Sequence, residues 1–549
     1  MYVYDKYDKL IIKERLLQYK NQVSRYISGE LSEKEFRILR LQNGIYMQKH
    51  AYMLRIAIPY GLLSSKQMRI LSFISNKYDK GYGHFTTRQN IQFNWINIKD
   101  TPKILKKLST VEMHSIQTSG NCIRNITSDE FFGVSNDENI DVRPFAEIIR
   151  QWSTFHPEFA YLPRKFKIAI SGSKKDRAVL LLHDIGLNII KKNKKIGFKI
   201  FVGGGMGRTP ILGKVIYNFL PWKHIITFLE AILRVYNKYG RRDNIYKSRI
   251  KILVNFLGIK TFIAKVIKEW LFIKNNFSTL TKKELKRISN YFINKKYKKY
   301  KNIDFFFQFK KKKNNNFQLW LKNNIKKHKI PGYSIVIISL KQIKTPPGDI
   351  TYKQMKFIAK LADKYSLSEI RVTHSQNLVF PNVKINNLYK LWKKLKKKKL
   401  NSSNINLITD IICCPGGDFC SLANAKSIPV SKNISHFFKD IFFQENIGKI
   451  NLNISGCINS CGHHHVGNIG ILGIDKNNTE WYQISLGGSQ GFFSSIGKII
   501  GPSFSSKEIP LIINKILQIY LRYRFKNEIF LKVINRLGIF LFKIFIYSL

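Results

Sequence analysis

Residues 59–96, PYGLLSSKQMRILSFISNKYDKGYGHFTTRQNIQFNWI, occur a second time as residues 346–383, PPGDITYKQMKFIAKLADKYSLSEIRVTHSQNLVFPNV. The two stretches align without gaps, and eleven of the paired residues are identical. Each stretch begins with apolar residues at helical spacing and ends with alternating apolar and polar residues, which predicts a helix followed by a strand. Because a repeat of this length indicates a duplicated unit, each copy is expected to supply half of a small α+β domain.

A second pair of stretches repeats further along each half. KFKIAISGS (165–173) aligns with KINLNISGC (449–457), IFVGG (200–204) with ISLGG (484–488), and ILRVYNKY (232–239) with ILQIYLRY (516–523). Strand, glycine turn and helix therefore recur in the same order. The whole chain is predicted to be one two-part unit that has been duplicated, with its halves paired about a pseudo-twofold axis.

The repeats divide the chain into three predicted domains of an α+β protein. Residues 50–110 and 331–400 should form the two halves of a composite, ferredoxin-like α+β domain. Residues 111–274 and 401–549 should form two related α/β domains. Residues 275–330, rich in Lys, Asn and Phe, are expected to be a linker or a degenerate insertion.

The charge balance is strongly positive, with 94 Lys and Arg against 34 Asp and Glu and a formal net charge of +60. The lysines are spread along the whole chain together with Asn and Ile, so a drift in composition explains them. The runs Lys310–Lys313 and Lys396–Lys399 are typical of solvated surface, and no zinc-finger or aromatic–basic RNA motif accompanies them. We expect no nucleic-acid partner, although the charge would help an acidic electron-donor protein or an anionic substrate to approach.

Neither end of the chain predicts a membrane segment. The N-terminal stretch MYVYDKYDKLIIKERLL has charges throughout and no apolar core of signal-peptide length. The apolar tail 529–549 is interrupted by three charged residues, Lys532, Arg536 and Lys543. It also contains NRLGI (535–539), which matches NFLGI (255–259) of the first copy. The tail is therefore expected to be a packing helix of a cytoplasmic protein that does not enter a membrane.

Five of the six cysteines lie within 413–461, in the second copy alone. CCPGGDFC (413–420) and SGCINSC (455–461) contain the pairs Cys414-x5-Cys420 and Cys457-x3-Cys461, whose four thiolates could hold zinc or an iron–sulfur cluster. The histidines His463, His464 and His465 keep zinc open, but structural zinc sites favour closer cysteine pairs. Cys413 competes with Cys414 for the first position. The first copy has Ser173 where the second has Cys457.

This cysteine pattern, the stretch TTRQNIQFNW (86–95) and the duplication together resemble the sirohaem-dependent nitrite and sulfite reductases, above all the bacterial sulfite reductase haemoprotein beta subunit. The resemblance covers nearly the whole chain except 275–330. It implies a [4Fe–4S] cluster held by Cys414, Cys420, Cys457 and Cys461, with Cys461 also binding the sirohaem iron. It implies six-electron reduction of sulfite to sulfide in assimilatory sulfur metabolism and cysteine biosynthesis, with reduction of nitrite to ammonium as the alternative.

The resemblance also implies which residues bind the substrate anion. They are Arg55 in YMLRIAIP, Arg124 in NCIRNI, and Lys165 and Lys167 in YLPRKFK. The two lysines alternate before SGS, so both should point to one face of a strand. They would bind the oxyanion, polarise its S–O bonds and deliver protons.

Sirohaem would be lined by further residues of the first copy: Arg88, Gln89, Asn121, Gly203 and Gly204. Ser375 stands at the position of Arg88 in the second copy, which predicts one functional and one relict site. VGGGMG (202–207) lacks the acidic residue of a dinucleotide-binding motif. Electrons are therefore expected from a partner, either an NADPH-dependent flavoprotein or a ferredoxin.

Overall fold

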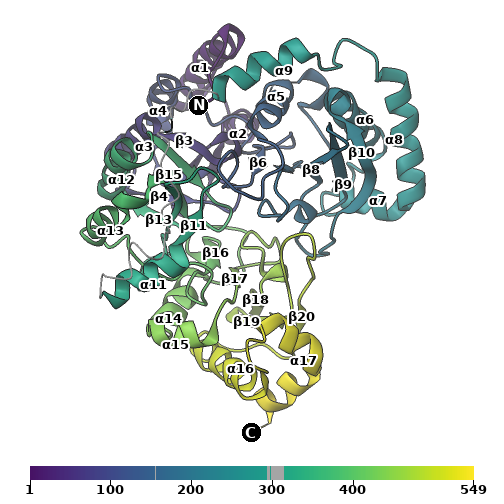
Figure 1. Ribbon diagram of the computed structural model, residues 1–549. Coiled ribbons are helices and arrows are strands. Elements are labelled where there is room, and N and C mark those ends of the chain that lie inside the picture. The colour runs from purple at the N-terminus through teal and green to yellow at the C-terminus, as the bar shows by residue number, and fades with distance from the viewer. Residues whose placement is uncertain (155, 293–296, 298–313, 549) are drawn as a thin grey trace.

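The computed structural model describes residues 1–154, 156–292, 297 and 314–548 of the chain. Figure 1 shows the arrangement of its domains. The run Lys310–Lys313 lies outside the described residues. Four five-stranded sheets organise the described part: two in a composite domain and one in each of two α/β domains. The predicted α+β architecture with a duplicated unit is confirmed.

The composite domain consists of two interlocked sheets. The first has the order β1 (Ile45–Met47), β2 (Tyr52–Ile56), β5 (Ile91–Ile96), β4 (Tyr82–Phe85), β13 (Asp349–Thr351). The second has the order β11 (Ile325–Lys327), β12 (Tyr333–Ile338), β15 (Leu378–Lys384), β14 (Glu369–Val372), β3 (Leu62–Ser64). Each copy thus lends its short strand, β3 or β13, to the sheet of the other, antiparallel to β14 or β4. This exchange makes the two halves one folding unit.

Two matching helices cover these sheets. The helices α3 (Ser65–Tyr78) and α12 (Tyr352–Tyr365) both begin with a capping box, in which a Ser or Thr and a Gln satisfy each other's free backbone N–H groups. The helices pack on each other, and Met68 and Met355 lie in one apolar core shared by both halves. The helices α4 (Thr101–Ser109) and α13 (Leu388–Lys396) complete the cover.

The two α/β domains repeat one sheet. The first has the order β10 (Lys214–Pro221), β9 (Lys195–Val202), β8 (Ile185–Lys192), β7 (Ile168–Ser171), β6 (Thr127–Ser128). The second has the order β16 (Ile412–Cys413), β17 (Leu452–Ser455), β18 (Ile469–Lys476), β19 (Thr479–Leu486), β20 (Lys498–Ile499). In both sheets the first three strands in sequence are parallel and the later ones antiparallel.

Helices pack on each α/β sheet, and the C-terminal helices of the two domains break at matching glycines. The first domain has α5 (Arg143–Ser153), α6 (Ile225–Tyr239), α7 (Ile250–Leu257) and α8 (Ile259–Ile273). The second has α14 (Ile428–Phe437), α15 (Ile441–Ile447), α16 (Ile509–Tyr523) and α17 (Phe530–Tyr547). Gly258 separates α7 from α8 at φ 74°, and Gly538 kinks α17 at φ 72°. The tail packs on α16, and no helix in the described part is long and apolar enough to cross a membrane.

The segment 275–330, expected to be a linker or insertion, contains α9 (Lys282–Ser289) near its start. Its last part is instead an element of the composite domain, because it contains α11 (Asn315–Asn324) and β11, which pairs with β12. The helix α11 and strand β11 repeat the arrangement of α2 (Glu33–Gln42) and β1 in the first half. The Lys- and Asn-rich composition hid an apolar face, because Phe317 and Trp320 are fully buried.

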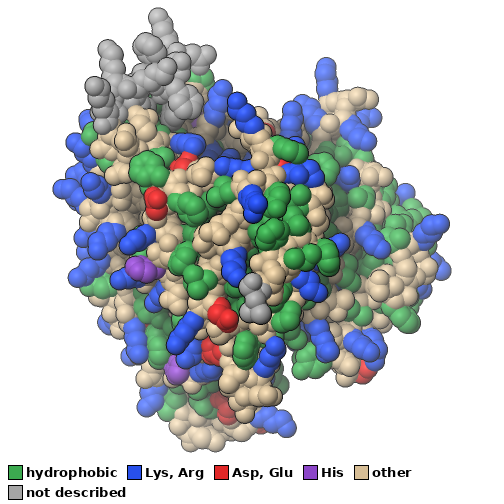
Figure 2. Space-filling model, turned by 90° about the horizontal axis from the view of Figure 1, so that it is seen from below, with side chains coloured by type: hydrophobic (Ala, Val, Ile, Leu, Met, Phe, Trp, Pro, Cys, Tyr) green, Lys and Arg blue, Asp and Glu red, His purple; other side chains and the backbone are tan. Residues whose placement is uncertain are grey.

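The N-terminal residues, which the sequence assigned to no domain, pack on the composite domain. Helix α1 (Lys6–Ile27) contributes Tyr19 to its core, and α2 contributes Phe36. Over the face seen in Figure 2, Lys and Arg side chains are scattered rather than gathered into one stripe, as a drift in composition predicts.

Candidate functional site

The four cysteines of the two pairs lie at one edge of the second α/β sheet. Because β16 and β17 are parallel, the segments that follow them leave from the same edge, and these segments carry Cys414 and Cys457. Burial, and after it the neighbouring Cys461, raise the pKa of Cys414 to about 12. Burial and Cys461 also raise the pKa of Cys420 and of Cys457. Cys414, Cys420 and Cys457 would therefore ionise together only with a bound cation to offset their charges.

The structure distinguishes Cys414 from its neighbour Cys413. Cys413 is 1% exposed and belongs to the apolar core of the domain with Ile408 and Val430. Its pKa is raised well above the usual range, first by burial. The sulfur of Cys414 instead accepts the backbone N–H of Gly456 at 3.2 Å, on the side of the other thiols. Cys414 thus has the surroundings expected of the predicted cluster ligand, whereas Cys413 lies in the apolar core.

The backbone around the cysteines fits an iron–sulfur cluster. A Cβ on Gly456 would lie 2.5 Å from the Ala425 carbonyl oxygen, and one on Gly462 would lie 1.9 Å from that of Ile454. Glycine thus lets the two cysteine segments pack without side chains between them. Across the described residues, no three His, Cys, Asp or Glu side chains converge on a point that a single metal ion could occupy. A [4Fe–4S] cluster binds each thiolate at a separate iron.

The predicted anion-binding residues converge beside the two segments that carry the cysteines, 413–420 and 455–461. Burial alone would raise the pKa of the Tyr46 hydroxyl, but the charges of Arg124, Arg55 and Lys165 outweigh burial and lower it. The pKa of Lys165 is lowered to about 8, chiefly by burial, although the nearby Cys461 thiolate opposes this shift. Lys165, and Arg55 through its charge acting on Cys420, therefore connect the cations of the first copy to the cysteines of the second.

Lys165 and Lys167 flank Phe166, which forms an isolated bridge to Ile123 just before β7. Phe166 is fully buried on one side, and both lysines are half-buried on the other, as their alternation predicted. Burial and then the charge of Lys165 lower the pKa of Lys167 well below its usual range. Among the described residues, no carboxylate forms an ion pair with either ammonium group. Such unpaired, desolvated cations favour a bound anion.

Backbone and side-chain contacts fix the two predicted arginines. Arg124 donates to the carbonyl oxygens of Thr118 at 2.6 Å and Gly120 at 2.7 Å. Arg55, on β2, donates to the Gln92 Oε1 at 3.1 Å and lies over the Tyr46 ring at 5.1 Å. We call Tyr46, Arg55, Arg124, Lys165 and Lys167 the anion cage.

Arg88 and Gln89, predicted together to line the cofactor, differ in the structure. Arg88 is half-buried next to the cage and donates to Thr127 Oγ1 at 2.7 Å; burial lowers its pKa to about 9. Gln89 is fully buried, with φ 56°. Its amide donates to the carbonyl oxygens of Ser128 and Val372 and accepts the N–H of Ser128. Its amide thus clamps β6 to β14 through backbone groups, and a contact between Gln89 and the cofactor stays a prediction.

The glycine loop and Asn121 lie at the edge of the first α/β domain. Gly203 and Gly204 follow β9, and a Cβ on Gly204 would meet the Leu181 carbonyl oxygen at 2.3 Å. The loop leads back into antiparallel β10, whereas a dinucleotide-binding turn leads into a helix. Asn121 is half-buried, and its carbonyl accepts the N–H of Leu162 at 2.7 Å.

Sequence reasoning missed three polar residues of this region: Tyr46, Arg249 and Lys251. Arg249 pairs with Asp184 at 2.6 Å, and its charge contributes to lowering the pKa of Lys165. The Lys251 ammonium donates to the carbonyl oxygens of Gly205 at 3.2 Å and Met206 at 3.1 Å, and so holds the glycine loop.

The duplication held a signal for two of these missed residues. Counted from the matching kinks at Gly258 and Gly538, the second copy has Ile529 and Leu531 in place of Arg249 and Lys251. A charge in one copy opposite an apolar residue in the other indicates a function that only one copy performs.

The three consecutive histidines link the two copies. His465 Nε2 lies 3.1 Å from the carbonyl oxygen of Gly207, at the end of the glycine loop. His463 and His464 are buried, and burial is the first cause that lowers their pKa values. The histidines thus place the cysteine segment 455–461 against the glycine loop of the other copy.

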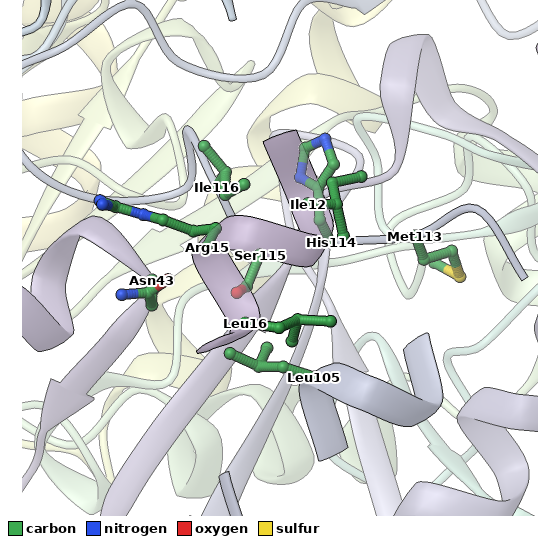
Figure 3. Close-up of a pocket in the computed structure, with 9 residues that line it drawn as sticks. All are labelled: Ile12, Arg15, Leu16, Asn43, Leu105, Met113, His114, Ser115 and Ile116. Carbon is green, nitrogen blue, oxygen red and sulfur yellow. The ribbon is translucent and has the colours of Figure 1, made fainter. Parts of the chain in front are cut away.

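A small cavity beneath α1 lies apart from the cage and the cysteines (Figure 3). It is lined by residues that include Ile12, Leu105 and His114, and its volume is about 20 Å³. Burial lowers the pKa of His114 to about 3. A space of this size holds about one water molecule, so it is not the substrate site.

Known proteins match this chain over both kinds of domain. The family description "Nitrite and sulphite reductase 4Fe-4S domain" matches residues 119–273 and 405–544. The description "Nitrite/Sulfite reductase ferredoxin-like half domain" matches residues 46–111 and 342–398. The NirA protein of Mycobacterium tuberculosis has the same fold, with a TM-score of 0.76 and 23% identity over 93% of this chain and 91% of that one.

Curated relatives match along most of their length. The chloroplastic ferredoxin–nitrite reductase of Arabidopsis thaliana is 25% identical over 93% of this chain and 84% of its own. The ferredoxin–nitrite reductase of Synechococcus elongatus is 24% identical, over 93% and 96%. Sulfite reductase [ferredoxin] 2 of Mycolicibacterium paratuberculosis is 25% identical, over 88% and 82%. Because the 4Fe-4S domain description alone spans more than half of the chain, the protein belongs to the nitrite and sulfite reductase family, whose cofactors are sirohaem and a [4Fe–4S] cluster.

Proposed function

We propose that this protein reduces sulfite to sulfide with six electrons. The observation that carries the proposal is the anion cage, in which Lys165 and Lys167 stand side by side without a carboxylate partner among the described residues. Sulfite presents three oxygen atoms and, when deprotonated, a double negative charge. A cage with two such lysines beside Arg55 and Arg124 suits this anion better than a singly charged one.

Different residues of the chain would have different roles in this reaction. Sirohaem and the cluster supply the electrons when bound. Arg55 and Arg124, oriented by their neighbours, would hold the oxyanion in place. Lys165 and Lys167 would stabilise negative charge on the oxygens and donate the protons with which they leave as water. Because the pKa of Lys165 is only about 8, it can release a proton near neutral pH.

Reduction of nitrite to ammonium is the second candidate. It is favoured by the names of the relatives, since the reductases from Arabidopsis thaliana and Synechococcus elongatus are ferredoxin–nitrite reductases. The cage would also bind nitrite, because its cations are not specific for one oxyanion.

Electrons would come from a partner protein, either a ferredoxin or a flavoprotein that uses NADPH. The names of the relatives support a ferredoxin. On the outer side of the cysteine segment 413–420, the Lys49 ammonium donates to the Gly417 carbonyl oxygen at 2.9 Å. Lys80 lies 3.4 Å from the ring centroid of Trp95, which packs edge-on against Phe419. An acidic carrier would find cations here, next to Cys420. A role in cysteine biosynthesis and a cytoplasmic location remain predictions.

A steady-state comparison tests the proposal. The anaerobically purified holoenzyme would be assayed with sulfite and with nitrite as alternative substrates of one chemically reduced donor. We expect a higher kcat/KM for sulfite, with sulfide as the product. A strong preference for nitrite would overturn the choice of substrate. A protein without a tetrapyrrole absorption band and without acid-labile sulfide would overturn the reaction class.

A further inference from the structure

Four positions of the first copy correspond to the four cysteines of the second. Two matched pairs of backbone hydrogen bonds establish the register. Lys329 N–H donates to the Val134 carbonyl at 2.8 Å as Lys49 N–H donates to that of Phe419 at 3.2 Å. In the same way, Asn139 N–H bonds Gly172, and Asn424 N–H bonds Gly456, both at 2.8 Å. Counted from these anchors, Cys414, Cys420, Cys457 and Cys461 correspond to Asp129, Ser135, Ser173 and Arg177.

These four residues contact one another through the guanidinium group of Arg177. Arg177 Nε donates to the Asp129 carboxylate at 2.9 and 3.0 Å. Arg177 Nη2 lies 2.8 Å from Ser173 Oγ and 3.4 Å from Ser135 Oγ. Ser173 Oγ donates to Asp129 at 2.6 Å, and Asp137 accepts from both terminal nitrogens of Arg177. We call Asp129, Ser135, Asp137, Ser173 and Arg177 the polar knot.

The knot is buried and its charges are satisfied. The Asp129 side chain is 1% exposed and that of Arg177 is 18% exposed. Burial alone would lower the pKa of Arg177, but Asp129 and Asp137 outweigh it and the pKa is raised. Phe131 stands at the position of Gly416, and Arg177 lies over its ring at 5.1 Å. In the first copy, side chains thus occupy the space that corresponds to the one left open by Gly416 beside the cysteines of the second copy.

The knot lies next to the strands that present the anion cage. Asp129 directly follows β6, and Ser173 lies two residues after β7. These strands are paired at only two positions, Thr127 with Ala169 and Ser128 with Ile170. At their other ends they are preceded by Arg124 and by Lys165 and Lys167. Beside these cations Arg124 N–H also donates to the Phe166 carbonyl at 2.7 Å, so this bond and the knot tie opposite ends of a short ladder and together set the relative position of the cations.

We infer that the polar knot is a metal-free counterpart of the iron–sulfur cluster, which cross-links the first copy as the cluster cross-links the second. By tying the ends of β6 and β7 it makes Arg177 a positioning residue for the anion cage. This inference goes beyond the proposed function, because it holds whether the substrate is sulfite or nitrite.

The first test replaces Arg177 by methionine, which keeps the length of the side chain and removes its charge. In Arg177→Met holoenzyme we expect amide hydrogen exchange in 129–137 and 171–178 to become at least ten times faster. The KM for sulfite and for nitrite should rise several-fold, while sirohaem content, cluster content and kcat change little. Arg177→Lys should restore part of the KM. The matched control is Arg234→Met, which removes an arginine that pairs with Glu158, Glu230 and Glu269 on the outside of the same domain.

Unchanged exchange in both segments of Arg177→Met, or changes no larger than those of Arg234→Met, would overturn the inference. If Arg177→Met does not fold, Ser173→Ala removes the hydroxyl that joins Asp129 to Arg177 and is held to the same outcomes. The second test uses full-length Cys420→Ser without a cluster. We expect fast exchange in 413–420 and 455–461 and retained protection in 129–137 and 171–178. Equal loosening of all four segments would show that the knot does not act independently of the cluster.

Discussion

In the first copy β2 carries Arg55, and in the second copy the matching strand β12 carries Ile337. Lys167 in the first copy corresponds to Asn451 in the second, and Arg249 corresponds to Ile529. The cysteines show the opposite pattern: all four occur in the second copy, and the first copy has the polar knot at the corresponding positions. Each copy therefore keeps one half of the chemistry and has lost the other half.

The two junctions between the copies differ accordingly. At one, the cage of the first copy meets the cysteines of the second, and Thr87 Oγ1 donates to the Cys461 carbonyl at 2.9 Å. At the other, Ile337 and Val379 pack with Phe131 and Val134 in a small apolar core. The duplicated fold thus has two equivalent junctions between its copies. At one of them apolar side chains fill the space where the other has the cage and the cysteines.

The largest expected effect comes from removing Cys461, the thiol predicted to be shared by the cluster and the sirohaem iron. Cys461→Ser should lose the sirohaem-coupled cluster and all turnover, because the serine hydroxyl is a poor ligand for iron. The measurement is EPR of the reduced protein together with iron and sulfide content. Its control is Cys413→Ala, which should keep the cluster and cost roughly 1 kcal/mol of stability, since Cys413 lies in the core. Normal cluster signals and full activity in Cys461→Ser would contradict its role as a ligand.

Next in size is the loss of a cage lysine. Lys167→Ala should leave cofactor content unchanged and lower sulfite turnover by about 10²-fold, because one cation and proton donor is lost. Steady-state kinetics with spectroscopic cofactor quantification would measure this. Lys174→Ala, at an exposed lysine of the following turn, is the control and should have no effect. Equal turnover in the two variants would remove Lys167 from the cage.

The two glutamine clamps should contribute equally to stability but differ in their effect on iron content. Gln376 repeats Gln89: its amide bonds the Phe85 carbonyl and both backbone groups of Cys413. Gln89→Leu and Gln376→Leu should each lower the free energy of unfolding by roughly 2 to 3 kcal/mol, because buried backbone groups lose their partners. Only Gln376→Leu should also reduce iron content, since Cys413 adjoins Cys414. Urea denaturation and iron analysis test this, and iron loss in Gln89→Leu alone would reverse the assignment.

The smallest effect concerns a carboxyl of the first copy next to Arg177. Burial raises the pKa of Asp176 from 3.8 to about 7. Between these values the folded protein holds a proton that the unfolded chain releases. The stability should therefore fall as pH rises from about 4 to 7, by no more than about 1.4 kcal/mol per pH unit from this group.

Asp176→Asn should remove that slope and stabilise the protein at pH 8 by at least about 1 kcal/mol, because the amide still accepts the Leu180 N–H. Denaturation curves at several pH values measure it. Asp137→Asn is the control of opposite sign. Burial would raise the pKa of Asp137, but Arg177 outweighs it and the pKa is about 2, so this variant should be less stable at neutral pH. Parallel pH profiles for Asp176→Asn and the unmodified protein would contradict the assignment.

Several features were open to prediction from local patterns. The apolar spacing in the two repeated stretches predicted the helices that form as α3 and α12. The alternation of Lys165 and Lys167 around Phe166 predicted that they share a side. The Lys- and Asn-rich composition around 317–320 was misleading, because a few buried aromatic residues outweigh many solvated lysines in deciding whether a segment folds.

By itself the sequence determined that the chain is duplicated, that its cysteines form two close pairs in one copy, and that Lys165 and Lys167 alternate along a strand of the other. These features can be recognised from the spacing of residues and from repeated stretches, because both are properties of the linear sequence and do not depend on which distant residues come into contact. Only the tertiary structure decided that β3 and β13 change places, that Cys414 rather than Cys413 faces the other thiols, and that Gln89 is a clamp. It also revealed that Arg177 ties together the residues standing at the positions of the cysteines. Each of these depends on which distant groups share a buried space, because a buried polar group is stable only where the folded chain brings it a partner.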